Sequence, residues 1–267
     1  MKKIVFIGAG SMAEAMISGF IATNTVPNSN VYVTNRSNFA RLVDLQTLYQ
    51  VQILEKLEDI ADASIVVLAM KPKDAKVAME SIAPYISDET GVISVLAGIS
   101  LQTLEKGLYK RPIARVMPNT SAAVGLSATG VAFNEHSNEP FKQKVLQLLQ
   151  AIGKVLQVEE EQIHTVTALS GSGPAYIYYL MEGFMEAGEE LGLQADEVRT
   201  LMTQTLLGAA KMLETYEQSP AELRQKVTSP NGTTAAGVQA LQDNHFKEAV
   251  ISCVKAAAAR SKELAVE

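Results

Sequence analysis

The first part of the chain alternates short apolar runs with stretches that suit helices. Runs rich in β-branched residues cover 4–8, 31–35, 64–70, 91–97, 113–118 and 130–134, and a last one covers 154–159. Several are apolar at successive rather than alternate positions, which is typical of strands buried on both faces of a parallel sheet. The alternation of strand and helix therefore predicts a doubly wound, mainly parallel α/β sheet.

The pattern changes after about residue 162. No further strand-like run follows, and alanine, leucine, glutamate and methionine dominate. Helices are predicted over 163–191, 195–215, 220–227, 233–241 and 245–265. We therefore expect an α/β domain at 1–162 and an all-helical domain at 163–267.

The predicted helix 195–215 is apolar around more than one face. Val198, Leu201, Leu206 and Leu213 follow one stripe, whereas Leu207 lies off it. A broad stripe indicates burial on more than one side. Roughly 105 residues of helix are few to cover so much apolar surface within one subunit. An oligomer interface is favoured, and a methionine-rich core is the alternative.

Composition limits the function without naming it. The chain has 267 residues, 47% of them hydrophobic, and a net charge of -6, which gives no general attraction to nucleic acid or anionic membranes. No apolar run approaches the ~20 residues that span a bilayer. One cysteine excludes an internal disulfide framework, and the three histidines lack metal-ligand spacing. We expect a cytoplasmic protein with no structural metal.

The stretch "GAGSMA" (8–13) follows the first predicted strand and opens a predicted helix. In a βαβ dinucleotide site, the first glycine allows the tight turn, the second lets the backbone approach the pyrophosphate, and the helix N-terminus supplies N–H groups. Ala13 stands where the third glycine would fall, a position that needs only close packing. Such turns also occur without ligands, but the α/β context favours binding. The candidate cofactor residues are Ile7, Gly8, Ala9, Gly10, Ser11 and Met12.

The end of the second predicted strand bears on the choice of cofactor. An acidic residue there would bind the ribose of NAD, but this chain has Asn35, Arg36 and Ser37. Arg36 can pair with a 2′-phosphate through charge-assisted hydrogen bonds. NADPH is therefore favoured, with NADH as the alternative cofactor. The competing interpretation of Arg36 is an ordinary solvated loop residue.

Five further motifs are more specific than a dinucleotide-binding turn. They are "AMKP" (69–72), "SVLAGIS" (94–100), "RVMPNTSA" (115–122), "ALSGSGPAY" (168–176) and "VTSPNGTT" (227–234). Together with "GAGSMA", in this order, they closely resemble the pyrroline-5-carboxylate reductase family. Asn231 and Ser121 are mild departures, where the family most often has glycine and often has proline.

The resemblance implies an architecture and a reaction. It implies an N-terminal Rossmann-type domain and an all-helical C-terminal domain that interlocks with its partner in a homodimer, often within a ring of dimers. The implied reaction is the reduction of 1-pyrroline-5-carboxylate to L-proline by NAD(P)H, the last step of proline biosynthesis. By the same resemblance, the residues that flank the nicotinamide and its ribose are Ala69, Met70, Lys71, Pro72, Ala97 and Gly98.

The substrate is a cyclic imine with a carboxylate, so its site needs hydrogen-bond donors. "SPNGTT" is a turn that leads into a predicted helix, whose N-terminus is an anion site. Ser229, Asn231, Gly232 and Thr233 are predicted to form that cradle. The resemblance places the Thr234 hydroxyl at the ring nitrogen, where it orients rather than protonates because a hydroxyl is a poor general acid. The alternative is a simple helix cap by Ser229 and Thr233.

Other candidates are weaker. Asn119 follows a predicted strand and is expected to reach the nicotinamide carboxamide or the substrate, and Glu217 is a further candidate for the substrate pocket. In "SGSGPAY" (170–176), packing and ligand contact are equally supported.

Two other functions stay open at this stage. A related β-hydroxyacid or ketone dehydrogenase would need a catalytic lysine or histidine on the first long helix, where only His164 is present. A non-catalytic NADP-binding paralogue would have no need of "SPNGTT".

Overall fold

The computed structural model describes residues 2–265, which form two compact units. The first runs to Pro174 and takes in the chain again from Ala256, and the second is Ala175–Lys255. Each unit is described by itself below.

The first unit is built on one eight-stranded sheet. In space the strands follow the order β3-β2-β1-β4-β5-β6-β7-β8, and every neighbouring pair is parallel except β6 and β7. The sequence prediction of a doubly wound, mainly parallel sheet is confirmed. The strands are β1 (Ile4–Ile7), β2 (Val31–Thr34), β3 (Gln52–Ile53), β4 (Ile65–Leu68), β5 (Gly91–Ser94), β6 (Ile113–Met117), β7 (Ser127–Phe133) and β8 (Gly153–Gln157).

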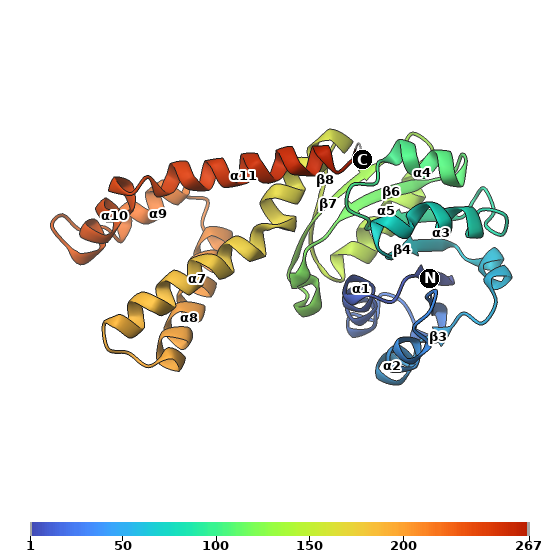
Figure 1. Ribbon diagram of the computed structural model, residues 1–267, viewed down its shortest axis with the longest axis horizontal. Coiled ribbons are helices and arrows are strands. Elements are labelled where there is room, and N and C mark those ends of the chain that lie inside the picture. The colour runs from blue at the N-terminus through green and yellow to red at the C-terminus, as the bar shows by residue number, and fades with distance from the viewer. Residues whose placement is uncertain (1, 266–267) are drawn as a thin grey trace. The chain divides into compact units, whose positions relative to one another are not determined.

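Helices cover both faces of this sheet (Figure 1). The helices α1 (Ser11–Ala22), α2 (Phe39–Tyr49) and α5 (Glu139–Gln150) pack on one face. The helices α3 (Ala75–Ile82) and α4 (Leu101–Leu108) pack on the other. The central strands are buried on both sides, since all four residues of β1 and of β4 are inaccessible to solvent or nearly so. This explains why their sequences are continuously apolar rather than alternating.

Most strand boundaries differ from the sequence prediction by one or two residues, and three strands differ for a clear reason. The expected strands 64–70 and 91–97 end at Leu68 and Ser94, because their apolar runs continue into turns. The expected strand 130–134 begins earlier, at Ser127, through small and polar residues. β3 was missed because it is two residues long and half polar. β7 runs antiparallel to β6, since a short 3₁₀ turn, η4 (Thr120–Val124), replaces a helical crossover.

The expected helix 163–191 is interrupted near its start. It consists of α6 (Ile163–Val166), a π-helical turn η6 (Thr167–Gly171) and α7 (Gly173–Glu190). The Ser172 N–H donates to the Thr167 carbonyl at 2.7 Å, the i to i−5 spacing of a π turn. The "SGSG" stretch therefore forms a break in the helix, and π turns often occur at functional sites.

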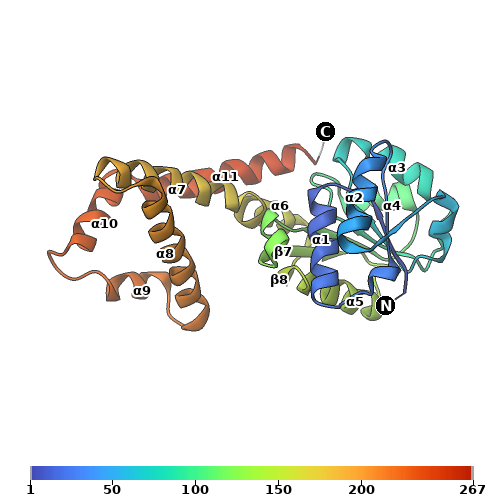
Figure 2. The same cartoon turned by 90° about the horizontal axis from the view of Figure 1, so that it is seen from below.

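The second unit is helical throughout. It contains α8 (Ala195–Thr215), α9 (Pro220–Lys226) and α10 (Thr233–Asp243), with most of α7 and the first half of α11 (Phe246–Glu263). Figure 2 shows the loop that joins α9 to α10. Val198 is the one buried residue of this unit.

The second unit has no core of its own to match its apolar content. Its exposed large apolar side chains are Ile177, Tyr178, Tyr179, Phe184, Leu191, Leu193, Leu201, Leu207, Met212, Leu213, Tyr216, Val227, Leu241, Phe246, Val250 and Ile251. The alternative of a methionine-rich core within one subunit is therefore wrong. So much exposed apolar surface is the mark of an interface.

None of the helices within residues 2–265 combines the length and the apolar character needed to cross a membrane. The same stretch holds no group of three or more His, Cys, Asp or Glu side chains placed to share a metal ion.

Candidate functional site

The turn after β1 is shaped by Gly8. Its φ of +112° is a conformation that L residues rarely adopt, and a Cβ added to it would lie 2.5 Å from the carbonyl carbon and oxygen of Ala69. Both the backbone angle and the close approach of the neighbouring turn require glycine. Ala13, at the third position of the motif, is completely buried against the core, where a methyl group fits.

Gly10 leaves the start of α1 open. It is the N-cap residue, and no side chain caps the helix there. A Cβ on Gly10 would have the Ala69 carbonyl oxygen as its nearest neighbour, at 4.0 Å. The first turn of α1 therefore presents N–H groups without a side-chain acceptor on an exposed glycine, which is the cradle that a pyrophosphate needs. Ser11 and Met12 belong to this first turn.

Arg41 on α2 fixes the same turn from outside and was missed in the sequence analysis. Its Nε donates to the Ala9 carbonyl at 3.1 Å, and its guanidinium pairs with Glu14 on α1. Glu14 also accepts from the Tyr49 hydroxyl at 3.2 Å, and burial, followed by the Glu14 charge, raises the Tyr49 pKa. Nothing in the local sequence distinguishes Arg41 from a solvated charge, because its partner stands 27 positions earlier.

The loop after β2 is held by Asn35. The Asn35 Nδ2 donates to the Asn38 carbonyl at 2.8 Å, and its Oδ1 accepts from the N–H groups of Ser37 and Asn38. Asn35 therefore shapes the loop with its side chain. Arg36 projects from this loop with 81% of its side chain exposed, and its Nη1 lies 3.5 Å from Oδ1 of Asp74.

The turns after β4 and β5 reach the same edge of the sheet as the glycine turn, because their strands are parallel to β1. Ala69 donates its N–H to the Ile7 carbonyl at 2.9 Å, so "AMKP" and "GAGSMA" are joined by backbone. Lys71 is exposed, and Pro72 opens the short η3 turn (Pro72–Asp74). The carboxyl edge thus gathers Ile7–Met12, Asn35–Ser37, Ala69–Pro72, Ala97 and Gly98.

Gly98 lies against the C-terminal end of α11. Its φ is +77°, and an added Cβ would come within 3.0 Å of the Leu264 carbonyl oxygen. The chain then enters α4, whose N-cap Ser100 accepts from the Thr103 N–H at 3.1 Å. The loop 97–100 therefore contacts Leu264 through Gly98 and leads directly into its own helix, while Ala97 stays exposed.

A partly buried ion pair supports that loop. Arg115 on β6 is 4% exposed, and its Nη1 lies 2.8 Å from Oε1 of Glu160 in the η5 turn (Glu160–Gln162). The same oxygen accepts from the Leu101 N–H at 2.7 Å, at the start of α4. Glu160 therefore connects β6 to the helix that follows Gly98, a role its sequence position did not reveal.

His164 lies beside this pair and contacts α11. Its Nδ1 is 3.0 Å from the Ser261 hydroxyl. Burial, and then the charges of Arg115 and Lys262, hold the His164 pKa below its usual value. His164 thus packs at the junction of α6 and α11.

Asn119 is engaged within the protein. Its Nδ2 donates to the Ser170 carbonyl in the π turn at 3.0 Å, and its Oδ1 caps η4 by accepting from the Ser121 N–H at 3.1 Å. It is 8% exposed. These contacts show Asn119 holding the π turn against the end of β6. A contact with ligand would have to add to them or replace them.

The second unit contains the "SPNGTT" loop at the start of α10. Gly232 is the N-cap and has no side-chain cap. The alternative of a cap by Ser229 or Thr233 is therefore wrong. Asn231 has φ +61°, a left-handed conformation that glycine and asparagine adopt most easily, which explains why asparagine can stand at a usual glycine position.

The loop is compact and open to solvent. The Gly232 N–H donates to the Ser229 carbonyl at 3.1 Å, and a Cβ at Gly232 would lie 2.5 Å from the Ser229 hydroxyl. Ser229, Thr233 and Thr234 are exposed. An uncapped helix start beside three hydroxyl groups can receive a carboxylate.

Glu217 lies in the link between α8 and α9 and is exposed. The neighbouring acid, Glu222, is the one that makes hydrogen bonds within the protein. It accepts from the Ser219 N–H and hydroxyl, both at 2.7 Å, and these bonds lower its pKa. The pair forms a capping box that starts α9.

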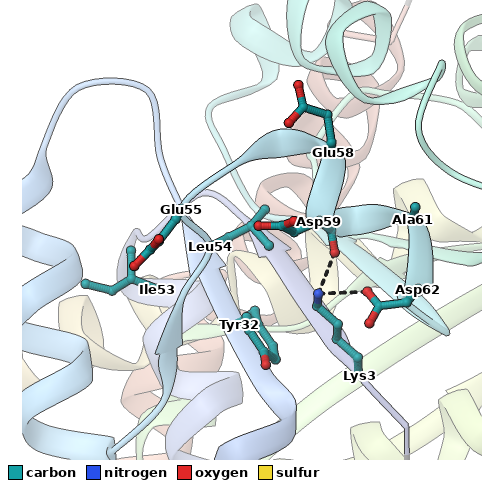
Figure 3. A pocket seen from close by; sticks show the side chains of 9 residues that line it. All are labelled: Lys3, Tyr32, Ile53, Leu54, Glu55, Glu58, Asp59, Ala61 and Asp62. Atoms are coloured by element: carbon teal, nitrogen blue, oxygen red, sulfur yellow. Dashed lines mark hydrogen bonds and ion pairs between the residues drawn. The ribbon is translucent and has the colours of Figure 1, made fainter.

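An acidic hollow lies at the opposite edge of the sheet (Figure 3). It is lined by Lys3, Tyr32, Ile53, Leu54, Glu55, Glu58, Asp59, Ala61 and Asp62. Lys3 lies in this hollow and has a structural role. Its Nζ lies 2.7 Å from Oδ1 of Asp62 and 4.4 Å from the centre of the Tyr32 ring. Lys3 precedes β1 and Asp62 precedes β4, so the hollow is at the amino ends of the strands, away from the glycine turn.

The class of protein follows from the first unit. A doubly wound sheet, a glycine turn with an open helix start, and neighbouring turns at the carboxyl edge define a Rossmann-type dinucleotide-binding domain. Residues 3–98 match the family described as NADP oxidoreductase, coenzyme F420-dependent. Residues 160–264 match the family described as pyrroline-5-carboxylate reductase dimerisation.

Relatives of known name match nearly the whole chain. Pyrroline-5-carboxylate reductase 1 of Bacillus subtilis (strain 168) is 47% identical over 265 residues, which cover 98% of this chain and 89% of the relative. The pyrroline-5-carboxylate reductase of Staphylococcus haemolyticus is 38% identical over 98% of this chain and 97% of its own. The chain belongs to the pyrroline-5-carboxylate reductase family, as its motifs predicted.

Solved structures agree with this assignment. A pyrroline-5-carboxylate reductase from Coxiella burnetii has a TM-score of 0.92 at 39% identity and covers 98% of both chains. The Plasmodium falciparum enzyme, determined with NADP bound, has a TM-score of 0.87 at 28% identity and covers 99% of this chain and 98% of its own.

Proposed function

We propose that this chain is an oxidoreductase that reduces 1-pyrroline-5-carboxylate to L-proline with a nicotinamide cofactor, completing proline biosynthesis. One observation carries the proposal: a chain 47% identical to a pyrroline-5-carboxylate reductase has two open helix starts, at Gly10 and at Gly232. The first suits a pyrophosphate and the second a carboxylate. A β-hydroxyacid dehydrogenase is not favoured, because His164 is packed against Ser261.

The cofactor residues fit the group they are proposed to hold. The N–H groups of the first turn of α1 would bind the pyrophosphate, and Arg36 would pair with a 2′-phosphate, which favours NADPH over NADH. The turns 69–72 and 97–98 would flank the nicotinamide and its ribose. When bound, the cofactor supplies the hydride that is added to the imine carbon.

The substrate loop would bind and orient the imine. The N–H groups at the start of α10, with the hydroxyls of Ser229 and Thr233, would receive the carboxylate. Asn231 and Gly232 give the loop its shape. Thr234 would hold the ring nitrogen by a hydrogen bond. Glu217 and Asn119 remain secondary candidates for the substrate pocket.

The electron balance of the reaction leaves Thr234 an orienting role. Hydride adds to the carbon of the imine, whose nitrogen is protonated, and the C=N double bond becomes a C–N single bond. The π electron pair of the double bond moves onto the nitrogen, which keeps its proton. The resulting amine takes up a further proton from water. A threonine hydroxyl need not ionise in either step, which agrees with its low acidity.

The organisation of the chain is part of the same proposal. We assign 1–162 to cofactor binding, and 163–267 to substrate binding and dimerisation. The exposed apolar side chains of the second unit support a homodimer formed through these helices, and a ring of dimers would extend it. A cytoplasmic location is proposed because the single cysteine fits a reducing compartment.

The test is oxidation of NADPH and of NADH by the purified protein, followed at the nicotinamide absorbance with and without 1-pyrroline-5-carboxylate. We expect substrate-dependent oxidation with both cofactors, and a lower KM for NADPH. Absence of substrate-dependent oxidation would show that the proposed function is wrong.

A further inference from the structure

Asp74 places a carboxylate beside the residue proposed to recognise the 2′-phosphate. Its Oδ1 lies 3.5 Å from Nη1 of Arg36, although the two residues belong to different turns of the sheet edge. Arg36 follows β2, and Asp74 ends the η3 turn after β4. Asp74 stands 38 positions after Arg36, so the sequence next to β2 gives no sign of it.

Asp74 is the less exposed member of this pair, and its backbone is held in a turn. Asp74 ends a turn that starts with Pro72, and its N–H donates to the Lys71 carbonyl at 2.9 Å. Its side chain is 39% exposed, whereas that of Arg36 is 81% exposed. An exposed pair at this distance is weak, so the guanidinium is free to turn toward a better anion.

The two cofactors make opposite demands on Asp74. A 2′-phosphate that takes the Arg36 guanidinium must displace the carboxylate or share the guanidinium with it, and two anions close together repel. A ribose 2′-hydroxyl can instead donate to a carboxylate, which is the role of the acidic residue at the end of β2 in NAD-binding domains.

We propose that Asp74 is a specificity-determining residue that limits the preference for NADPH and keeps NADH usable. It supplies, from the turn after β4, the carboxylate that the end of β2 lacks. Arg36 and Asp74 then act as opposed selectors, one for each cofactor. This inference rests on the proposed cofactor site at residues 35–37.

The test is the pair of dissociation constants for NADPH and NADH, measured by nicotinamide fluorescence without substrate. In Asp74→Asn, NADPH should bind more tightly and NADH more weakly, so the ratio of the two constants should move about tenfold toward NADPH. Increasing salt should reduce this difference, because the pair is exposed.

Glu89→Gln is the matched control. Glu89 is exposed in the turn before β5, at the amino edge of the sheet, so this variant removes the same charge far from the turn that holds Arg36. Its ratio should equal that of the unmodified chain.

The outcomes separate the two proposals. If the unmodified chain binds both cofactors and Asp74→Asn leaves their ratio unchanged, or weakens both equally, the role of Asp74 is wrong and the proposed function stands. If the unmodified chain binds neither cofactor, both proposals are wrong. If Glu89→Gln changes the ratio of the two dissociation constants as much as Asp74→Asn does, the effect comes from net charge, and the role of Asp74 is wrong.

Discussion

Gly8 lies directly against Ala69, so that a single added Cβ would come 2.5 Å from the Ala69 carbonyl group. Two turns that are 61 positions apart in the sequence are thereby packed backbone to backbone, and the open start of α1 is held at the carboxyl edge of the sheet.

Gly8→Ala should therefore lower both stability and cofactor affinity. A positive φ and a backbone clash together cost about 3 kcal/mol of unfolding free energy. Gly10→Ala is the matched control, because its Cβ would meet no atom closer than 4.0 Å. It should keep the melting temperature but weaken NADPH binding by obstructing the approach of the pyrophosphate. Thermal unfolding and nicotinamide fluorescence distinguish the two, and equal melting temperatures for both variants would contradict the packing account.

Arg36→Gln should weaken NADPH binding much more than NADH binding. The guanidinium is proposed to pair with the 2′-phosphate, which NADH lacks, so about a tenfold or greater loss is expected for NADPH alone. KM values for both cofactors check this. Equal losses would mean that Arg36 supports the loop rather than selecting the cofactor.

Thr234→Ala should lower kcat by roughly 10- to 100-fold, because the ring nitrogen loses its orienting hydroxyl. NADPH affinity should be unchanged, since Thr234 belongs to the proposed substrate loop. Thr234→Ser keeps the hydroxyl and should retain most of the rate. Steady-state kinetics of the two variants test the role, and an unchanged kcat in Thr234→Ala would remove Thr234 from the mechanism.

Glu160→Ala should destabilise the protein by about 2 kcal/mol. It leaves the buried Arg115 guanidinium without its partner, and the figure allows for the partial exposure of Glu160. It also frees the Leu101 N–H, so KM for the cofactor should rise as loop 97–100 loosens. Glu161→Ala removes the exposed neighbouring charge and should change neither quantity. Urea denaturation and cofactor KM provide the measurements.

His164 should make stability fall as the pH drops below its usual pKa of 6.5. Its folded-state pKa is lowered, so the unfolded chain takes up the proton first, and the stabilisation is lost as the pH falls from 6.5 through the folded value. His164→Gln should flatten the melting temperature between pH 7.5 and 5.5. Glu222 does not contribute to the change in stability between pH 7.5 and 5.5. Its pKa is lowered from the usual 4.5, so it takes up its proton only at a lower pH. An NMR titration showing a His164 pKa above 6.5 would reverse this expectation.

The sequence by itself determined the fold class and the candidate motifs. Continuous apolar runs rich in β-branched residues are typical of strands covered on both faces, and "GAGSMA" directly after such a run predicted the turn that Gly8 forms. "SPNGTT" likewise predicted a turn into a helix, and Gly232 is the N-cap of that helix. The role of Asn231 and Gly232 in holding a substrate stays a prediction.

Only the tertiary structure decided which charged side chains act together. Arg41 binds the Ala9 carbonyl, Glu160 joins Arg115 to the start of α4, and Asp74 faces Arg36. Each of these partners lies at least 27 positions away in the chain, and any exposed charge offers the same local pattern. The parallel sheet brings them together because successive strands deliver their following turns to one edge. The hydrophobic periodicity of a segment shows which of its faces is buried. The partner of a charged side chain depends instead on where the other strands of the sheet end.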